Sequence, residues 1–416
     1  EPFEGKVLTD GLNFPWEMVW EPDKQIWVTE RAGKNILTVN PETGESKILY
    51  TFSNAFVGPQ HEGVLGLALS PEFLSGKGKN YVYMAYTYKN EKDEEFARIV
   101  RLTYDKKAGK FANETVILDK LPGSNDHNSG RLIFGPDGKL YYTIGDQGHN
   151  QGKNLEKPIE AQRTATAEEV AKKDFSSYPG STLRINVDGS ITKDNPVING
   201  VKSHIYTYGH RNAQGLVFVG GNLFSTEHGP SSDDELNLLE TGGNYGWPNV
   251  VGYKDNLAYE YVNNSDNKKT YKETDFNADN FKEPLKTFFT VKNDYSFKNE
   301  QCGQMAYLCW PTIAPSSVAY YPKDGKIEGW RNSLLITSLK NGALYRVPLN
   351  ADGKNIQGDA IKYFKTNNRY RVVFVSPDTG KIYIATDTTG NAMGTDGKPT
   401  KEMENKGAIL IFEYKK

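Results

Sequence analysis

One sequence pattern recurs six times along the 416 residues of the chain. Each copy has an apolar stretch, a turn rich in Pro, Asp, Asn or Gly, an alternating run with aromatic residues, and then Thr, Ser or an acid. The copies are Trp16–Glu30, Gly63–Thr87, Gly130–Asp146, Gln214–Glu227, Ser316–Ser338 and Tyr370–Asp387. Such turns between alternating runs are the strongest short-range signal of a β-hairpin. The chain is therefore predicted to contain six hairpins.

The intervals between the hairpins favour a closed ring of sheets. Each interval leaves room for two more strands, and 25 Tyr, 19 Phe and 40 Gly are typical of a β-rich chain. Six four-stranded antiparallel units around an axis form a six-bladed β-propeller, which protects most strand edges. Pairs of packed sheets are the alternative. We expect an all-β propeller as one domain over residues 1–416, with a helix near Thr166–Asp174, where Thr166 and Glu169 predict a capping box.

The same repeats predict where a functional site lies. The two ends of a hairpin lie side by side, so residues just before and just after each copy gather on one face, at the mouth of the central channel. Four of the six histidines occupy such positions, namely His61, His127, His210 and His228. We therefore expect the active site at the channel mouth.

Several groups at these positions suggest chemistry, and each also has a simpler explanation. Asp126-His127 suggests a general base with an orienting carboxylate, or an Asx-turn beside a solvated histidine. Four cations, Arg211, Lys340, Arg369 and Arg371, suit a small polyanion with carboxylates or phosphates, or are ordinary solvated strand residues. The acidic segment His228–Glu235 suggests calcium binding or a solvated turn. Tyr307 and Trp310 suggest stacking on sugar rings or packing in the core.

Composition and missing motifs exclude other classes of protein. Lys and Arg number 50 against 52 Asp and Glu, which argues against a nucleic-acid binder and an anionic-membrane binder. No apolar run is long enough for a membrane span. The chain has no P-loop, no strand-linked GxGxxG, no HExxH and no GxSxG. Nicotinamide, ATP and esterase chemistries are therefore unsupported.

The two cysteines, Cys302 and Cys309, are separated by six residues. This spacing suits a small loop closed by a disulfide. A zinc site is the functional alternative, although no histidine lies nearby. The simplest alternative is that the two cysteines are free, buried thiols. A disulfide would indicate an oxidising compartment, so we expect a periplasmic or secreted protein.

From about Leu12 onward the chain resembles the soluble pyrroloquinoline-quinone (PQQ)-dependent glucose dehydrogenases, within the wider glucose/sorbosone dehydrogenase group. The resemblance is densest in SNDHNSGRLIFGPDGKLYYTIGDQGHNQ, SHIYTYGHRNAQGL, EHGPSSDDELNLL, GGNYGWPNVVGYKD, CGQMAYLCWPTIAPSS, SLKNG, NNRYR and TDTTGN. It implies a six-bladed propeller that holds PQQ over the channel mouth, and it matches the family disulfide to Cys302 and Cys309.

The resemblance also implies catalytic roles. His127 would take the proton of the C1 hydroxyl of glucose or a related aldose as hydride moves to C5 of PQQ, which gives the lactone. Asp126 would orient His127, Asp146 would brace it from behind, and Arg211 would polarise the C5 carbonyl. Electrons would then pass to an external acceptor, which is a dye, a quinone or a separate cytochrome.

Binding roles follow from the same matches. The cofactor would be held by Arg211, Asn212, His228, Lys340, Arg369, Arg371 and Thr312. The sugar would be contacted by His61, Gln151, Tyr307 and Trp310. The backbone carbonyls of Gly229 and Pro230 would bind the calcium beside PQQ. A second, paired calcium site resembles one formed by Asp234, Tyr245, Val251, Tyr253, Asp255, Asp275 and Thr312, which in the family supports a homodimer.

Four departures from the family pattern mark where this chain would differ. His61 and His228 stand at glutamine positions, with Gln60 beside the first, and Asp275 stands at a glutamate position. The segment Leu257–Thr274 is shorter than in the best-known members. Sugar preference, the second calcium site and the homodimer are the properties that these departures would change.

Two other functions fit the same fold. A calcium-dependent hydrolase such as a lactonase would use calcium and an acid or base at the same mouth, but it would not need four cations there. A non-enzymatic propeller would bind sugars or protein partners, but it would not need His127, Arg211 and Lys340 together. Lactone hydrolysis by quinone-free protein would favour the first of these alternatives.

Overall fold

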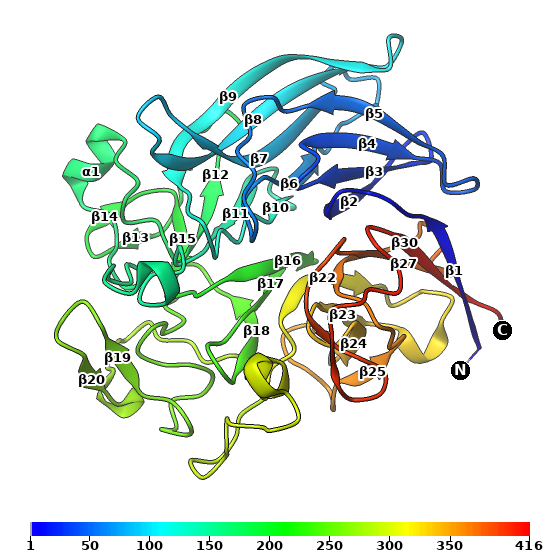
Figure 1. The fold of residues 1–416 in the computed structure, drawn as a ribbon. Coiled ribbons are helices and arrows are strands. Elements are labelled where there is room, and N and C mark those ends of the chain that lie inside the picture. The colour runs from blue at the N-terminus through cyan, green and yellow to red at the C-terminus, as the bar shows by residue number, and fades with distance from the viewer. Residues whose placement is uncertain (1) are drawn as a thin grey trace.

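The computed structural model describes residues 2–416 and forms a closed ring of six four-stranded antiparallel sheets around a central axis (Figure 1). This confirms the predicted six-bladed propeller. The first three blades, from the axis outward, are β2 (Pro15–Glu21), β3 (Gln25–Glu30), β4 (Asn35–Val39) and β5 (Ser46–Thr51); β6 (Val64–Leu69), β7 (Tyr81–Lys89), β8 (Glu95–Asp105) and β9 (Lys110–Pro122); and β10 (Leu132–Phe134), β11 (Leu140–Ile144), β12 (Ser181–Ile185) and β15 (Ile205–Tyr208).

The other three blades complete the ring. They are β16 (Ala213–Val219), β17 (Asn222–Glu227), β18 (Asp234–Leu239) and β21 (Lys286–Phe288); β22 (Pro315–Tyr321), β23 (Ser333–Ser338), β24 (Ala343–Pro348) and β25 (Ile361–Tyr363); and β26 (Tyr370–Val375), β27 (Lys381–Thr386), β30 (Ile409–Tyr414) and β1 (Phe3–Thr9). All six predicted hairpins are present, and each forms the inner two strands of a blade.

The last blade is closed by the first strand of the chain. The strand β1 pairs antiparallel with β30, from Phe3 opposite Tyr414 to Thr9 opposite Ile409. Figure 1 shows the two ends of the chain side by side at this blade. Because β1 precedes the first blade in the chain yet is the outer strand of the last blade, the two ends of the chain are held in one sheet, and β30 is paired on both sides. The repeat pattern did not predict this exchange.

Connections between the strands form the rest of the structure. The short pairs are β13 (Val197–Ile198) with β14 (Val201–Lys202), β19 (Tyr261–Asn263) with β20 (Lys269–Tyr271), and β28 (Ala392–Met393) with β29 (Pro399–Thr400). The helices are α1 (Ala167–Lys172) and the 3₁₀ segments Gly152–Asn154, Glu273–Asp275, Gly303–Cys309 and Glu328–Trp330. Thr166 and Glu169 form the predicted capping box at the start of α1. The predicted disulfide between Cys302 and Cys309 is also present.

Apolar side chains from neighbouring blades fill the space between the sheets. Trp27, in the first blade, is buried against Phe73, Tyr104 and Phe111, with ring centroids 5.0 to 5.4 Å apart and in edge-to-face orientations. Such pairs add to the free energy gained from burial. Aromatic strand residues, which indicated the fold in the sequence, thus form the contacts between blades.

One buried guanidinium lies among the inner strands around the central axis. Arg131, which precedes β10, donates from Nη1 to Oε2 of Glu17 at 2.6 Å and lies 4.0 Å from the Trp16 ring centroid. It also donates to the carbonyl oxygens of Gln214 at 2.7 Å and Ser316 at 2.8 Å. One side chain therefore joins the third blade to the first, fourth and fifth.

We predict that Arg131→Met lowers the free energy of unfolding by about 3–5 kcal/mol, because the Glu17 carboxylate is then buried without its partner. The measurement is equilibrium unfolding in denaturant. The control is the double variant Glu17→Leu/Arg131→Met, which removes both charges and should recover most of the loss. Equal destabilisation of the single and double variants would contradict this account.

Candidate active site

A cavity of about 560 Å³ opens at one mouth of the channel. Its walls come from residues that precede or follow the inner strands, as the repeats predicted. It is lined by Phe14, Arg31, Pro59, Gln60, His61, Asp126, His127, Asn212, Gln214, His228, Tyr307, Leu339, Arg369, Arg371, Asp387, Thr389, Gly390 and Asn391. Eight predicted site residues are among them: His61, Asp126, His127, Asn212, His228, Tyr307, Arg369 and Arg371.

His127 is held by a carboxylate beneath the cavity. Its Nδ1 lies 2.7 Å from Oδ1 of Asp146, which follows β11 and is fully buried. Although burial would raise it, the pKa of Asp146 lies below its usual value because of His127 and Arg211. An ionised Asp146 accepts the Nδ1 hydrogen, and Nε2 of His127 is then left with its lone pair. This nitrogen can act as a base.

The two carboxylates near His127 make different contacts with it. Oδ2 of Asp126 lies 3.9 Å from Nε2, and Oδ1 of Asp126 accepts the backbone N–H of His127 at 2.9 Å. The direct ring contact belongs to Asp146, which also accepts from Nε1 of Trp247 at 2.9 Å. The structure therefore corrects the sequence interpretation: Asp146, and not Asp126, orients the imidazole, while Asp126 shapes the turn.

The backbone around His127 depends on one glycine. His127 has a φ of 51°, in the left-handed region, and Gly145 lies against it. A Cβ atom at position 145 would lie 1.7 Å from the carbonyl oxygen of His127. Only glycine leaves room for this close approach. The base is thus positioned by backbone packing as well as by Asp146.

Arg211 reaches the same site from the neighbouring blade. Its backbone N–H donates to Oε2 of Glu227 at 2.8 Å, and Nη2 donates to Oε1 of Gln151 at 3.1 Å. Its guanidinium lies 5.4 Å from the ring centroid of Trp247. Nε of Arg211 is buried and has no acceptor among residues 2–416. A buried donor of this kind suits an acceptor group supplied by a ligand.

Arg369 and Arg371 share one buried carboxylate. The Asp387 carboxylate accepts a hydrogen bond from Nε of Arg369 at 3.0 Å, and it accepts two from Nε and Nη2 of Arg371, each at 2.9 Å. Although burial would raise it, the pKa of Asp387 is lowered by these two arginines. Nη1 of Arg371 donates a hydrogen bond to Oε1 of Gln214 at 2.6 Å. Both guanidinium groups line the cavity in fixed orientations.

A further cavity cation, Arg31, was missed in the sequence. It lies over the Phe14 ring at 4.6 Å and donates to the backbone carbonyl of Glu62 at 2.9 Å. Burial, together with the positive charge of Arg371, lowers its pKa to about 10. Arg31 follows directly on the first repeat, so the rule about repeat ends could have found it.

Lys340, Thr312 and Trp310 form a group beside the cavity. Nζ of Lys340 donates to the carbonyl oxygen of Trp310 and to Oγ1 of Thr312, the latter at 3.1 Å. Burial lowers the pKa of Lys340 to about 8. At that pKa the ammonium is still largely protonated at neutral pH, so it adds a positive charge next to the arginines.

The residues predicted to hold calcium are only partly brought together. Asp234 accepts three backbone N–H groups, from Gly229, Ile313 and Ala314, at 2.6 to 2.8 Å. These bonds fix the loop that carries Gly229 and Pro230. Tyr245 is buried, its ring stacks on that of His210, and its hydroxyl donates to the backbone carbonyl of Leu238. These contacts do not place the side chain of Asp234 or Tyr245 as a ligand of a metal ion.

Other acids occupy the region predicted for the second calcium site. Asp275 is exposed and accepts the backbone N–H of Lys272, whereas Glu273 is buried and accepts those of Val251 and Asn256 at 2.8 and 2.9 Å. Burial, together with the negative charge of Asp255, raises the pKa of Glu273 to about 8. The structure thus places Glu273, and not Asp275, beside Asp255 and Val251. Tyr253, also predicted there, is half-buried.

Within the described residues, no three His, Cys, Asp or Glu side chains are grouped closely enough to hold a metal ion. The calcium assignments therefore stay predictions. None of the helices described in residues 2–416 is long and apolar enough to cross a membrane.

Comparison with known proteins shows which proteins the chain is similar to. The chain is 46% identical to quinoprotein glucose dehydrogenase B of Acinetobacter calcoaceticus, over 100% of this chain and 92% of that protein. It is 24% identical to an aldose sugar dehydrogenase of Escherichia coli, over 93% and 91% of the two chains. The PQQ-bound aldose sugar dehydrogenase of Streptomyces coelicolor superposes with a TM-score of 0.68 and 26% identity, over 99% and 98%.

The sequence profile described as Glucose / Sorbosone dehydrogenase matches residues 12–286 and 292–394. This match covers most of the chain, including the six hairpins and the cavity at the channel mouth. The chain belongs to the glucose/sorbosone dehydrogenase family.

Proposed function

We propose that the protein oxidises the C1 hydroxyl of glucose and related aldoses to the lactone, with PQQ and calcium as cofactors and an external electron acceptor. The observation that carries this proposal is the pairing of His127 with Asp146 beside a cavity lined by arginines. The name of the Acinetobacter calcoaceticus relative and the PQQ-bound Streptomyces coelicolor structure support the same activity. The disulfide supports a periplasmic or secreted location.

The residues around the cavity fit an anionic quinone with several carboxylates. Arg31, Arg369 and Arg371 line the cavity, while Lys340 and Arg211 lie at its edge. The unpaired Nε of Arg211 matches a quinone carbonyl oxygen. Asn212, Thr312 and His228 would add neutral contacts. When bound, PQQ would accept a hydride and calcium would act as a Lewis acid.

The chain itself would handle the proton. His127 accepts the C1 hydroxyl proton at Nε2, and the ionised Asp146 stabilises the imidazolium that forms. Gln151, whose Nε2 lies 3.4 Å from Nε2 of His127, is placed to contact the same hydroxyl. Tyr307 and Trp310 would border the sugar ring. The carbonyls of Gly229 and Pro230 would hold calcium, on a loop fixed by Asp234.

We further propose that a second calcium region, centred on Asp255 and Glu273, supports the fold and a homodimer. Glu273 accepts the backbone N–H groups of Val251 and Asn256 and lies beside Asp255, and it carries a raised pKa that a bound cation would lower. Calcium favours carboxylate and carbonyl oxygens of this kind.

Another feature at the mouth is the neutral state of His61. Nε2 of His61 accepts from Nε1 of Trp16 at 3.2 Å, so Nδ1 carries the hydrogen. Nδ1 is buried and has no acceptor in the described part of the chain. The pKa of His61 lies well below its ordinary value of 6.5 because of burial and the nearby charges of Arg371 and Arg31. His61 would present a hydrogen-bond donor to the bound ligands.

We predict that quinone-free protein mixed with PQQ and calcium oxidises glucose with an electron-accepting dye. The measurement is dye reduction, with calcium omitted and with PQQ omitted as controls. Each omission should abolish turnover. If the fully reconstituted protein oxidises no aldose, the proposed function is wrong.

We predict that His127→Gln lowers kcat by about 10²–10⁴-fold, because glutamine cannot accept the proton. PQQ affinity, followed by absorbance titration, should be nearly unchanged. The comparison of Asp146→Asn with Asp126→Asn tests the corrected roles: the first should lower kcat more, since only Asp146 contacts the ring. A larger effect at Asp126, or loss of PQQ binding in His127→Gln, would contradict them.

We predict that His61 makes the unfolding free energy fall as the pH drops below about 6.5. The unfolded chain gains a proton at this histidine there, whereas the folded chain does not. The slope for one such group is about 1.4 kcal/mol per pH unit. Denaturant unfolding of cofactor-free protein at pH 7.5 and 5.5 should show a smaller decline for His61→Gln than for the unmodified chain. Parallel declines would show that His61 is not held neutral.

A further inference from the structure

A partly buried lysine near the mouth cavity has no part in the proposed chemistry. Lys365 lies in the connection between β25 and β26, and its Nζ donates to the backbone carbonyl oxygens of Asn341 and Met393. Burial lowers the pKa of Lys365 to about 8. The ammonium is therefore still largely protonated at neutral pH, and it joins two pieces of main chain through neutral acceptors.

Both pieces of main chain carry residues of the mouth. Asn341 lies in the turn between β23 and β24, directly after Lys340. Met393 lies in the connection from β27 to β30, and residues 389–391 of that connection line the cavity. Lys365 thus contacts the main chain of two segments, whereas other residues of these segments face the cavity or lie at its edge.

The two segments are also joined to each other. The backbone N–H of Met393 donates to the carbonyl oxygen of Lys340 at 2.8 Å, and that of Thr366 donates to the carbonyl oxygen of Gly342 at 3.0 Å. Gly342 permits this close approach, since its φ is 51° and a Cβ atom there would lie 2.6 Å from the carbonyl oxygen of Thr366. The position of the main chain at Lys340 is therefore tied to that of Lys365.

The connection from β27 to β30 contacts two side chains of the mouth. Nδ2 of Asn391 donates to the hydroxyl of Tyr307 at 2.6 Å, and the carbonyl oxygen of Asn391 accepts from Nη1 of Arg369 at 2.9 Å. Gly390 lies against the same arginine, because a Cβ atom at position 390 would be 2.4 Å from Cδ of Arg369. A shift of this connection would move a guanidinium that is expected to bind the cofactor.

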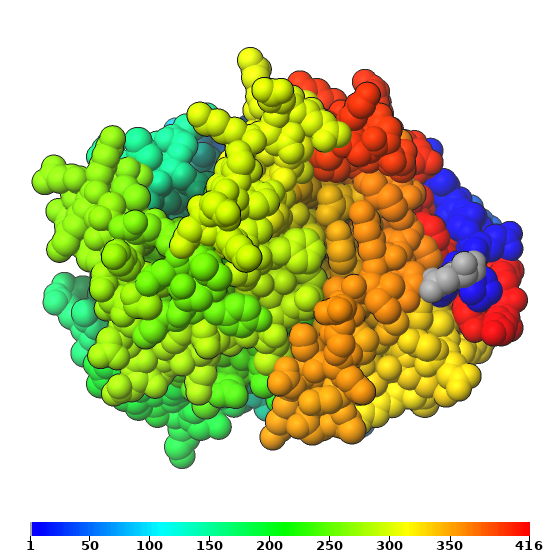
Figure 2. Space-filling model, turned by 90° about the horizontal axis from the view of Figure 1, so that it is seen from below, coloured from blue at the N-terminus to red at the C-terminus, as the bar shows by residue number. Residues whose placement is uncertain are grey.

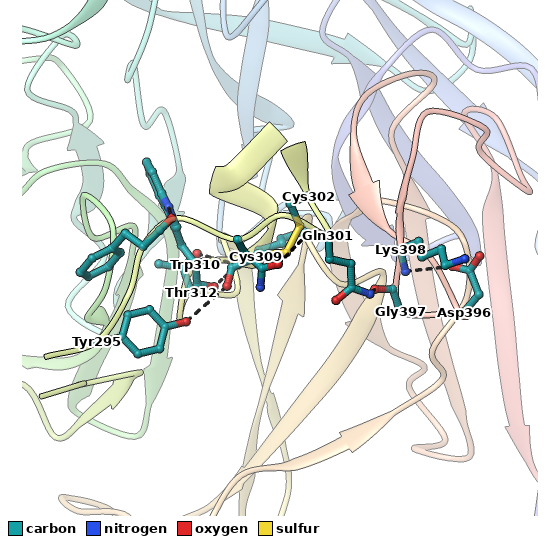
Figure 3. The surroundings of a disulfide bond; sticks show 12 residues. Tyr295, Gln301, Cys302, Cys309, Trp310, Thr312, Asp396, Gly397 and Lys398 are labelled. Carbon is teal, nitrogen blue, oxygen red and sulfur yellow. Dashed lines mark hydrogen bonds between the residues drawn. A yellow bond between two sulfur atoms is a disulfide. The ribbon is translucent and has the colours of Figure 1, made fainter. Parts of the chain in front are cut away.

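The disulfide segment supports the same connection from another direction. In Figure 2 the yellow segment near residue 300 lies beside the red connection from β27 to β30, at the top of the view. Figure 3 shows the contact itself: Nε2 of Gln301 donates to the carbonyl oxygen of Gly397 at 2.7 Å, next to the bond between Cys302 and Cys309. Lys365 supplies the support from the side of β25 and β26.

We propose that Lys365 is a positioning residue, whose ammonium fixes the main chain next to Lys340 and Arg369 so that both cations are oriented before the cofactor binds. This role rests on the proposed binding of PQQ and adds a residue that acts through others. An ammonium has three N–H donors, and its hydrogen bonds to carbonyl oxygens are stronger than those between neutral groups. Cations that are already oriented bind an anion more tightly, because less conformational freedom is lost on binding.

Hydrogen exchange of quinone-free protein, followed by mass spectrometry, tests the link without any cofactor. We expect Lys365→Met to speed the exchange of the Met393 backbone N–H by about tenfold, while amides of the central strand β27 keep their rates. The matched control is Lys362→Met, which changes an exposed lysine of β25 and should leave both rates as they are. Unchanged exchange at Met393 in Lys365→Met, or equal acceleration in β27, would overturn the proposal.

Titration with PQQ, followed by absorbance, tests the consequence for the mouth. Lys365→Met should bind PQQ about tenfold more weakly than the unmodified protein and Lys362→Met. Lys365→Arg, which keeps a cationic donor, should recover most of the affinity. If Lys365→Met does not fold, Lys365→Gln, which keeps one amide donor, replaces it in both measurements.

The two measurements separate this role from the proposed function. If the unmodified protein binds no PQQ, the proposed function fails, and exchange at Met393 still decides whether Lys365 fixes the two segments. If the unmodified protein binds PQQ and the Lys365→Met variant binds it equally well, the positioning role fails alone.

Discussion

The buried ion pair between Arg131 and Glu17 joins inner strands around the axis of the propeller. Arg131 also donates to backbone carbonyls of the fourth and fifth blades, so one side chain contacts three other blades. The pair is costly to desolvate, so it depends on the close fit of Trp16 and the backbone carbonyls around it. Residues of the mouth cavity lie next to these same inner strands, so the pair supports the frame that holds them.

The electrostatics of the mouth follow from that geometry. Burial keeps His61 neutral, together with the positive charges of Arg371 and Arg31, which also suit an anionic cofactor. Asp387 holds Arg369 and Arg371 in place. His127 differs because it has its own buried carboxylate in Asp146. The same cavity therefore contains a histidine that presents a lone pair and a histidine that presents a hydrogen. The indole of Trp16 and the carboxylate of Asp146 set these two roles, because the first donates to a ring nitrogen and the second accepts from one.

Much of the fold could be predicted because its units are local. A hairpin is specified by its own alternation and turn, and each hairpin end is placed at the mouth by ring geometry alone. The closing strand β1 was missed because its partner lies at the other end of the chain. The disulfide was predictable for the same reason as the hairpins, because its two cysteines are near in sequence.

The details of the site were harder to predict, because they depend on residues that are distant in sequence. Adjacency in the sequence predicts Asp126 as the carboxylate that orients the His127 ring. The left-handed backbone at His127 instead directs the ring toward Asp146, across the hairpin. Asp275 and Glu273 are two residues apart in one 3₁₀ turn, and only burial separates them. Side-chain type and spacing thus locate a site, whereas the packing of loops against it assigns the roles.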